Sequence, residues 1–196
     1  MVTQQTAGDA AGIEDVLLQH PVIASVKDEA DLEAVLHVQC PVVFVLFGSL
    51  ITIPGIVERL KLAGKTVFLD VDLIEGFSNR PVVIDFLKEN TRLDGVLSTK
   101  SLMVKRAKEA GLMSIHRFFL IDSFSYHNLP KQVSLSGADA VEILPGCMPR
   151  VLSWVKKDID QPLIAGGLVC DKQDVMSALG AGAMAIASSN REVWNM

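Results

Sequence analysis

The sequence is poor in aromatic residues, which make up only 6% of its 196 residues, whereas 49% are hydrophobic. The apolar content is therefore mostly Val, Ile, Leu and Ala, the composition of parallel strands that are buried on both faces. This composition favours an α/β protein over an all-β sandwich. A chain of this length buries enough surface in a single core, so no second domain is required.

Cysteine is also scarce. The three cysteines, Cys40, Cys147 and Cys170, lie far apart in the sequence and are odd in number. Their spacing matches neither a disulfide framework nor a pair of metal ligands. We interpret them as isolated core thiols of a protein in the reducing cytosol, and we therefore expect a cytoplasmic location.

The sequence lacks an excess of positive charge and a long apolar run. Its net charge of −5 gives no overall attraction to nucleic acid or to an anionic membrane, so RNA contact would need a local basic patch. The apolar stretch of residues 42–53 is interrupted and is shorter than the roughly 18 residues of a membrane span. The polar residues 1–12 lack the pattern of a secretory signal. We therefore expect no membrane association.

Short aliphatic runs alternate with segments of helical periodicity eight times along the chain. This alternation predicts a single α/β domain over residues 1–196, a compact (β/α)8 barrel of the TIM type. Residues 1–20 form a polar leader in which Ile13–Gln19 is either a short helix that caps the base of the barrel or part of a loosely ordered terminus. The strands are expected at residues 21–26, 42–47, 66–73, 94–100, 114–122, 140–146, 162–165 and 183–187. The helices between and after them are expected at residues 28–38, 53–63, 81–89, 101–110, 127–135, 147–156 and 171–179.

The last two predicted strands end in small residues, Gly166 and Gly167 in one and Ser188 and Ser189 in the other. Glycine lets backbone N–H groups approach a ligand closely, and serine hydroxyls add further donors. Barrels of this type bind phosphate after strands 7 and 8. The pattern indicates a phosphate site, with ordinary turns as the alternative.

Acidic residues mark the third predicted strand. Alternation places the aliphatic residues, Leu73 among them, against the helices and directs Asp70 and Asp72 into the barrel, with Glu75 in the following loop. Such acids could hold Mg²⁺, hydrogen-bond to ligand hydroxyls or form structural pairs. We expect no metal, because acids of this kind also serve structural pairs.

Four further residues stand out at the predicted strand ends. Lys100 either meets an anion or is solvated. Arg117 interrupts an apolar strand, so it is either an anion ligand or, as we expect, one half of an internal ion pair with Asp70 or Asp72. Glu142 lies alone among apolar residues, where a carboxylate is costly unless it is hydrogen-bonded. Gly146 ends the sixth strand sharply.

Several uncommon motifs occur together and in order. They are Asp72-Leu-Ile-Glu-Gly76, Asp94-Gly-Val-Leu-Ser-Thr-Lys100, Phe119-Leu-Ile-Asp-Ser123, Glu142-Ile-Leu-Pro-Gly146 and Ile164-Ala-Gly-Gly-Leu168. With them the chain resembles, over Pro21–Trp194, the glycerol uptake operon antiterminator family of bacterial regulators. At one position the chain departs from the family pattern, because Asp70 stands where the family usually has a histidine. This additional interior acid demands a partner such as Arg117.

The resemblance implies a barrel that responds to glycerol 3-phosphate. With this effector bound, such a protein acts on the leader messenger RNA of a glycerol-utilisation operon, prevents termination and stabilises the transcript. The implied partners are glycerol 3-phosphate and the leader mRNA, with no other cofactor, and a homo-oligomer remains an open alternative. We expect the ligand to contact Asp72, Glu75, Lys100, Arg117, Glu142, Gly146, Gly166, Gly167, Ser188 and Ser189.

Two other functions compete with the regulator. The first is a barrel enzyme acting on a small phosphate ester, with Asp72, Glu75 and Glu142 as acid and base. The second is a non-catalytic protein that binds another phosphorylated metabolite. No serine has the context of a nucleophile elbow, and three of the four histidines fall outside strand ends. We therefore expect no catalytic residues. The RNA surface stays unlocated, because the lysines are spread over several helices.

Overall fold

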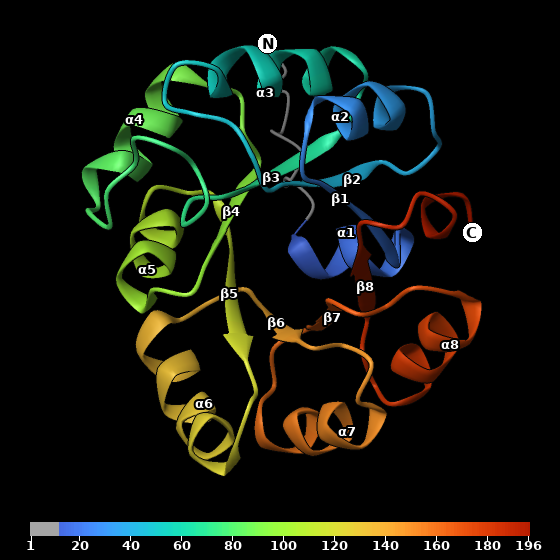
Figure 1. Cartoon of the computed structure of the whole chain (residues 1–196). Helices are drawn as coiled ribbons and strands as arrows, with labels where there is room; N and C mark the ends of the chain where they lie inside the picture. Colours follow the sequence, from blue (N-terminus) through green and yellow to red (C-terminus); the bar gives the residue numbers. More distant parts are fainter. Residues whose placement is uncertain (1–11) are drawn as a thin grey trace, which may run out of the picture.

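Eight parallel strands close into a barrel in which each strand pairs with the next and β8 pairs with β1 (Figure 1). The computed structural model describes residues 12–196. The strands are β1 (Val22–Val26), β2 (Val42–Val45), β3 (Thr66–Asp70), β4 (Gly95–Ser98), β5 (Met113–Phe119), β6 (Ala140–Leu144), β7 (Leu163–Gly166) and β8 (Ala185–Ser188). The helices are α1 (Ile13–Gln19), α2 (Glu29–Leu36), α3 (Ile53–Leu62), α4 (Val82–Asn90), α5 (Ser101–Glu109), α6 (Ser123–Ser136), α7 (Pro149–Asp158) and α8 (Lys172–Gly180), followed by the 3-10 turn η1 (Val193–Asn195).

The predicted (β/α)8 barrel is confirmed, and the differences are at element ends. Strand β3 ends at Asp70, so the prediction that Leu73 faces the helices is wrong, and this side chain is 52% exposed. Helix α6 begins at Ser123 rather than at residue 127, because the Asp122 side chain accepts a hydrogen bond from the Ser125 N–H at 2.8 Å. Such an N-cap satisfies a donor that the first helical turn leaves free.

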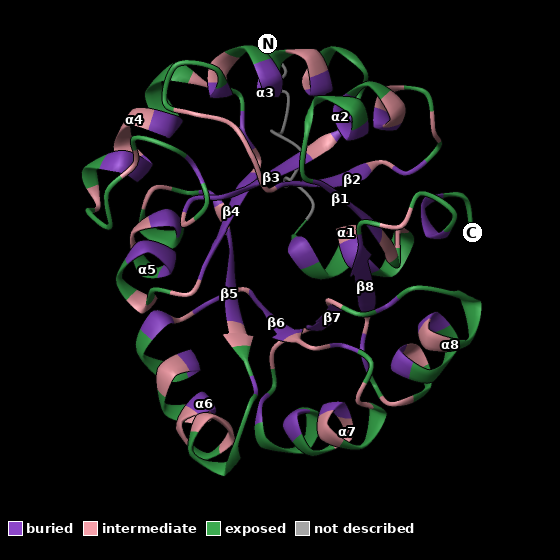
Figure 2. Cartoon of the chain, in the orientation of Figure 1, coloured by how far each residue is buried: buried purple, intermediate pink, exposed green. Residues whose placement is uncertain are grey.

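Two layers of apolar side chains hold the barrel together. In Figure 2 the strands are mostly buried, and the helices around them carry both buried and exposed residues. The outer layer joins the strands to the surrounding helices in two clusters. The inner layer fills the barrel and includes Phe44 and Phe68, whose rings meet edge to face at 5.6 Å. Leu17 of α1 packs on the same inner cluster, so the predicted capping helix forms and closes the amino-terminal end of the barrel. The rest of the polar leader, residues 1–11, lies outside the described residues.

The cysteine interpretation needs a correction. Cys40 is buried, but Cys147 and Cys170 are exposed. They follow β6 and β7 in loops at the carboxyl-terminal face, where the chain has left the sheet, so they are not core thiols. None of the helices in the described part of the chain combines the length and apolar character that a membrane crossing requires.

Two glycines offer a matched test of barrel packing. A Cβ atom on Gly95 of β4 would lie 2.5 Å from the Phe68 ring and 2.6 Å from the Met113 carbonyl oxygen, whereas a Cβ on Gly55 of α3 would meet nothing within 4 Å. We expect Gly95→Ala to lower the free energy of unfolding by about 1–3 kcal/mol through overpacking. We expect Gly55→Ala to raise it by up to about 1 kcal/mol, because alanine favours helix. Urea unfolding measures both, and equal effects would contradict a tightly filled barrel interior.

Candidate ligand site

A buried ion cluster lies inside the barrel near the carboxyl ends of the strands. The Nε atom of Arg117 on β5 donates to Oε2 of Glu142 on β6 at 2.6 Å, and its Nη1 atom donates to Oδ2 of Asp70 on β3. All three side chains are almost fully buried. Arg117 and Glu142 are register partners in the sheet, so strand pairing itself sets this contact. Arg117 thus forms the expected internal pair with Asp70, and Glu142 is its second partner.

The electrostatics of the cluster follow from its burial. Burial raises the pKa of Asp70 to about 6, although the Arg117 charge acts in the opposite direction. Burial by itself lowers the pKa of Arg117. The negative charges of Glu142 and Asp70 have a larger, opposite effect, so the pKa of Arg117 is raised above its ordinary value. With both carboxylates ionised the cluster carries an excess negative charge. An anionic ligand group is therefore not stabilised at its centre.

A cavity of about 270 Å³ lies against this cluster. Arg117 and Glu142 line it together with residues of β1, β6 and β8, the residue that follows β2, and the loops after β7 and β8. Of the ligand residues expected from the sequence, the structure brings five to this cavity: Arg117, Glu142, Gly167, Ser188 and Ser189.

The loops after β7 and β8 present backbone donors to the cavity. Gly167 and Leu168 have left-handed backbone conformations, with φ of 70° and 56°. Outside the strand ladders of residues 12–196, no backbone acceptor engages the N–H groups of Gly167, Leu168 or Ser189. The Ser188 hydroxyl, in contrast, donates to the Val169 carbonyl at 2.6 Å and accepts from the Asn190 N–H at 3.1 Å, so it holds the loops together.

The other two expected glycines are required by close packing. A Cβ atom on Gly166 would lie 2.3 Å from Oε1 of Glu142, so only glycine leaves room for that carboxylate. The Gly146 N–H donates to the carbonyl oxygens of Gly166 and Gly167 at 2.6 and 2.9 Å. Gly146 thus supports the loop after β7 and does not line the cavity.

Asp72 and Lys100 belong to a neighbouring polar cluster. Oδ1 of Asp72 accepts from the Ser98 hydroxyl at 2.7 Å, and Oδ2 accepts from both the N–H and the hydroxyl of Thr99 at 2.6 Å. Burial raises the pKa of Asp72, but these hydrogen bonds outweigh it and hold the pKa below its ordinary value. Lys100 Nζ lies 3.0 Å from the Thr99 hydroxyl. Both predicted residues therefore meet at the carboxyl-terminal edge, beside the 270 Å³ cavity rather than in its lining.

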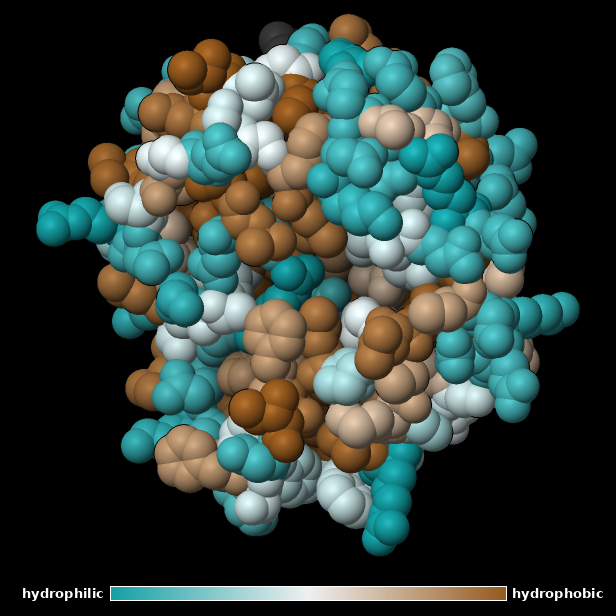
Figure 3. Space-filling view, in the orientation of Figure 1, coloured by the Kyte–Doolittle hydropathy of each residue, from teal (hydrophilic) through white to brown (hydrophobic). Residues whose placement is uncertain are grey.

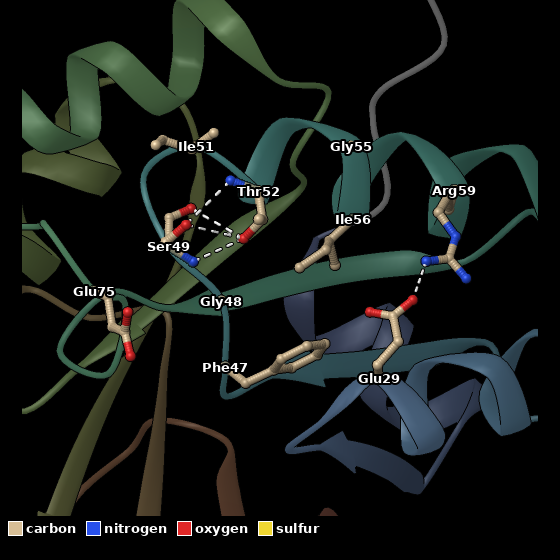
Figure 4. Close-up of a pocket in the computed structure, with 10 residues that line it drawn as sticks. All are labelled: Glu29, Phe47, Gly48, Ser49, Ile51, Thr52, Gly55, Ile56, Arg59 and Glu75. Carbon is tan, nitrogen blue, oxygen red and sulfur yellow. Dashed lines mark hydrogen bonds and ion pairs between the residues drawn. The ribbon is translucent and has the colours of Figure 1, made fainter.

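Glu75 lies elsewhere, on a larger hollow of about 710 Å³ between α2, α3 and the loops after β2 and β3 (Figure 4). Several polar groups around this hollow are engaged with protein partners. Arg59 pairs with Glu29 and Glu33, and the Ser49 N–H donates to the Thr52 hydroxyl at 2.9 Å. Despite its size, this hollow offers fewer convergent groups for a ligand than the smaller cavity over the ion cluster.

Sequence reasoning missed several residues that line the cavity. They are Ser25, Leu46, Leu144, Leu168, Val169, Cys170, Ala187 and Asn190. The only signal was Ser25, a polar residue inside the apolar first strand. His116, which the sequence left aside, is buried, and burial lowers its pKa to about 4. Within residues 12–196, no group of three or more His, Cys, Asp or Glu side chains is arranged to hold a metal ion.

The ion cluster predicts a strong dependence on Arg117. Arg117→Ala should lower the free energy of unfolding by about 3–5 kcal/mol, because it leaves two buried carboxylates without their counterion. The matched control is Arg92→Ala, which removes an exposed pair with Glu58 and should cost less than about 1 kcal/mol. Chemical denaturation gives both values. Similar losses for the two variants would show that burial does not amplify the Arg117 pairs.

Asp70 predicts a pH dependence of stability. Its pKa of about 6 in the folded protein exceeds the ordinary value of 3.8, so the folded state holds this proton more tightly than the unfolded state. This contribution to stability is complete below pH 3.8 and is lost as the pH rises through 6. Between these values the wild type should lose up to about 3 kcal/mol relative to Asp70→Asn, which does not titrate. Unfolding free energies measured across this range test the expectation, and parallel pH profiles would contradict it.

Comparison with known proteins places the chain in a family. The model of the family described as glycerol-3-phosphate responsive antiterminator matches residues 22–194. An Escherichia coli K12 relative, described as the uncharacterized protein YgcP, is 51% identical over 181 residues, which cover 92% of this chain and 95% of that protein.

Two crystal structures agree with this match. The glycerol uptake operon antiterminator regulatory protein of Listeria monocytogenes has a TM-score of 0.85 at 29% identity, with coverage of 88% of this chain and 94% of the other. A glycerol uptake operon antiterminator-related protein of Thermotoga maritima has a TM-score of 0.79 at 31% identity, with coverage of 89% and 98%. From the barrel and these matches together, we conclude that the chain belongs to the glycerol-3-phosphate responsive antiterminator family.

Proposed function

We propose that the chain binds glycerol 3-phosphate in the 270 Å³ cavity and, with this effector bound, acts on a leader messenger RNA to prevent termination and stabilise the transcript. Family membership supports the effector and the class of activity. The observation that carries the ligand assignment is the group of backbone N–H donors of Gly167, Leu168 and Ser189 beside the cavity. Unpaired backbone donors of this kind form a nest for a phosphate group.

The charge distribution supports one orientation of the ligand. The phosphate belongs at the loops after β7 and β8, where the donors are, because the two carboxylates of the ion cluster repel an anion. The hydroxyl end of the ligand then faces Arg117 and Glu142, which line the same cavity. A carboxylate accepts hydrogen bonds from hydroxyls and a guanidinium donates to them. Asp72 and Lys100, on the adjacent edge, act on the ligand through the local field rather than by lining the cavity.

Regulation requires that effector and RNA influence each other's affinity. If glycerol 3-phosphate tightens RNA binding by a given factor, RNA must tighten effector binding by the same factor, typically about 5- to 150-fold. The effector should also raise the melting temperature, because it binds the folded state alone, and free glycerol should do much less. The measurement is binding of an in vitro transcribed glycerol-operon leader, with and without glycerol 3-phosphate, at one fixed salt concentration.

Position 167 gives a matched pair of variants for this experiment. Gly167→Asp and Gly167→Asn add side chains of nearly equal size beside Leu144 and share the same backbone cost, but only the aspartate adds a negative charge. Glycerol 3-phosphate should bind Gly167→Asp at least about tenfold more weakly than Gly167→Asn, because like charges repel at contact distance. Equal affinities of the two variants for glycerol 3-phosphate would contradict the placement of the phosphate at this loop. Effector binding without any change in RNA affinity would contradict the regulator and leave a phosphometabolite-binding protein.

A further inference from the structure

The ion cluster leaves two of its polar atoms free. Arg117 donates through Nε to Oε2 of Glu142 and through Nη1 to Oδ2 of Asp70. Within residues 12–196, Nη2 of Arg117 and Oε1 of Glu142 have no hydrogen-bond partner, and neither is fully buried, because no side-chain nitrogen or oxygen there is both buried and unpaired. Both residues line the 270 Å³ cavity, so these two atoms face it. Figure 3 shows a central hollow with hydrophilic residues at its floor.

The two free atoms are neighbours with opposite hydrogen-bonding character. Nη2 lies on the same edge of the planar guanidinium as Nε, and Oε1 belongs to the same carboxylate as Oε2. The bond of 2.6 Å between Nε and Oε2 therefore holds the free atoms side by side. A guanidinium nitrogen only donates hydrogen bonds, whereas an ionised carboxylate oxygen only accepts them. The floor of the cavity thus presents one donor next to one acceptor.

A hydroxyl group satisfies both atoms at once, because it donates its proton to Oε1 and accepts a hydrogen bond from Nη2. A carbonyl oxygen in the same place accepts from Nη2 but has no proton for Oε1, and a methylene group pairs with neither atom. A charged group that a ligand covers without pairing loses its hydration for nothing in return. Sites built to bind a hydroxyl therefore reject analogues that lack it.

The place of Oε1 decides which hydroxyl of the ligand it meets. A Cβ atom on Gly166 would lie 2.3 Å from Oε1, so this oxygen lies against the backbone of Gly166. The next residue is Gly167, a proposed phosphate donor, and consecutive Cα atoms are about 3.8 Å apart. A hydroxyl that reaches Oε1 must therefore lie close to the phosphate along the ligand. In glycerol 3-phosphate this is the C2 hydroxyl, on the carbon next to the one that carries the phosphate.

We propose that the cavity reads the oxidation state of its ligand at C2, with Glu142 as the residue that determines specificity. It takes a phosphorylated alcohol and rejects the corresponding ketone. This inference rests on the proposed function, because the phosphate at the loops after β7 and β8 sets which ligand atom reaches Glu142. Such a site distinguishes the reduced from the oxidised form of one phosphorylated three-carbon skeleton.

Isothermal titration calorimetry of the wild type with three ligands tests the selectivity. Glycerol 3-phosphate has a hydroxyl at C2, dihydroxyacetone phosphate has a carbonyl there, and 3-hydroxypropyl phosphate has a methylene. The last two should each bind at least about tenfold more weakly than glycerol 3-phosphate, because each leaves the Glu142 carboxylate without its hydrogen bond. This comparison needs no variant, so it decides the proposal even if a substitution in the cluster prevents folding.

Glu142→Gln tests the role of the carboxylate. Because Nε of Arg117 is a donor, the amide oxygen must face it, and the amide nitrogen then takes the place of Oε1. The free acceptor becomes a donor that pairs with a carbonyl, so the preference for glycerol 3-phosphate over dihydroxyacetone phosphate should fall at least about tenfold. The matched control is Asp70→Asn, which removes one negative charge from the same cluster but keeps Oε1. It should retain the wild-type preference even if both affinities change.

The outcomes separate this inference from the proposed function. If the wild type binds glycerol 3-phosphate and either analogue equally well, the selectivity is wrong and the proposed function stands. A folded Glu142→Gln variant that keeps the wild-type preference also overturns the inference, because a purely structural Glu142 would change all affinities alike. So does an Asp70→Asn variant that loses the preference to the same extent. If the wild type does not bind glycerol 3-phosphate at all, the proposed function fails and this inference fails with it.

Discussion

At the carboxyl-terminal end of the barrel, the structure depends on one guanidinium that stays charged although it is buried inside the closed sheet. Arg117 meets this requirement with two carboxylates from different strands, Glu142 on the adjacent β6 and Asp70 on β3. Each contact imposes a further condition on the chain. The Glu142 carboxylate lies where a side chain on residue 166 would be, and Asp70 accepts the Asp72 N–H that turns the chain out of β3. The glycine and the turn are therefore parts of one electrostatic arrangement.

This arrangement shapes the ligand site by charge as well as by space. One cation between two buried acids makes the floor of the cavity suitable for hydroxyl groups and unfavourable for a phosphate. In the proposed binding mode the phosphate lies instead at the loops after β7 and β8, where Gly167 and Leu168 turn their backbone through left-handed conformations. Asp70, where the resembled family usually has a histidine, strengthens this division because it adds a second acid to the floor.

The same face also separates polar chemistry from apolar contact. The floor is charged and buried, whereas the loops around it expose aliphatic and aromatic side chains such as Ile51 and Ile121. In the larger hollow beside Glu75, Arg59 is paired with Glu29, and the Thr52 hydroxyl accepts the Ser49 N–H.

The sequence by itself determined the barrel, because short aliphatic runs and segments of helical periodicity alternate eight times, and this local pattern can be recognised without any knowledge of tertiary contacts. It also determined that Arg117 needs an acid, since a lone charge among apolar residues is costly wherever it lies. The tertiary structure alone decided which acids these are, because the curvature of the sheet brings Asp70 to Arg117 across 47 positions of sequence. It likewise decided that Glu75 lies apart from the cavity and that Ser25 joins it. Strand lengths and loop paths set these distances, and both depend on packing between distant segments that no local pattern records.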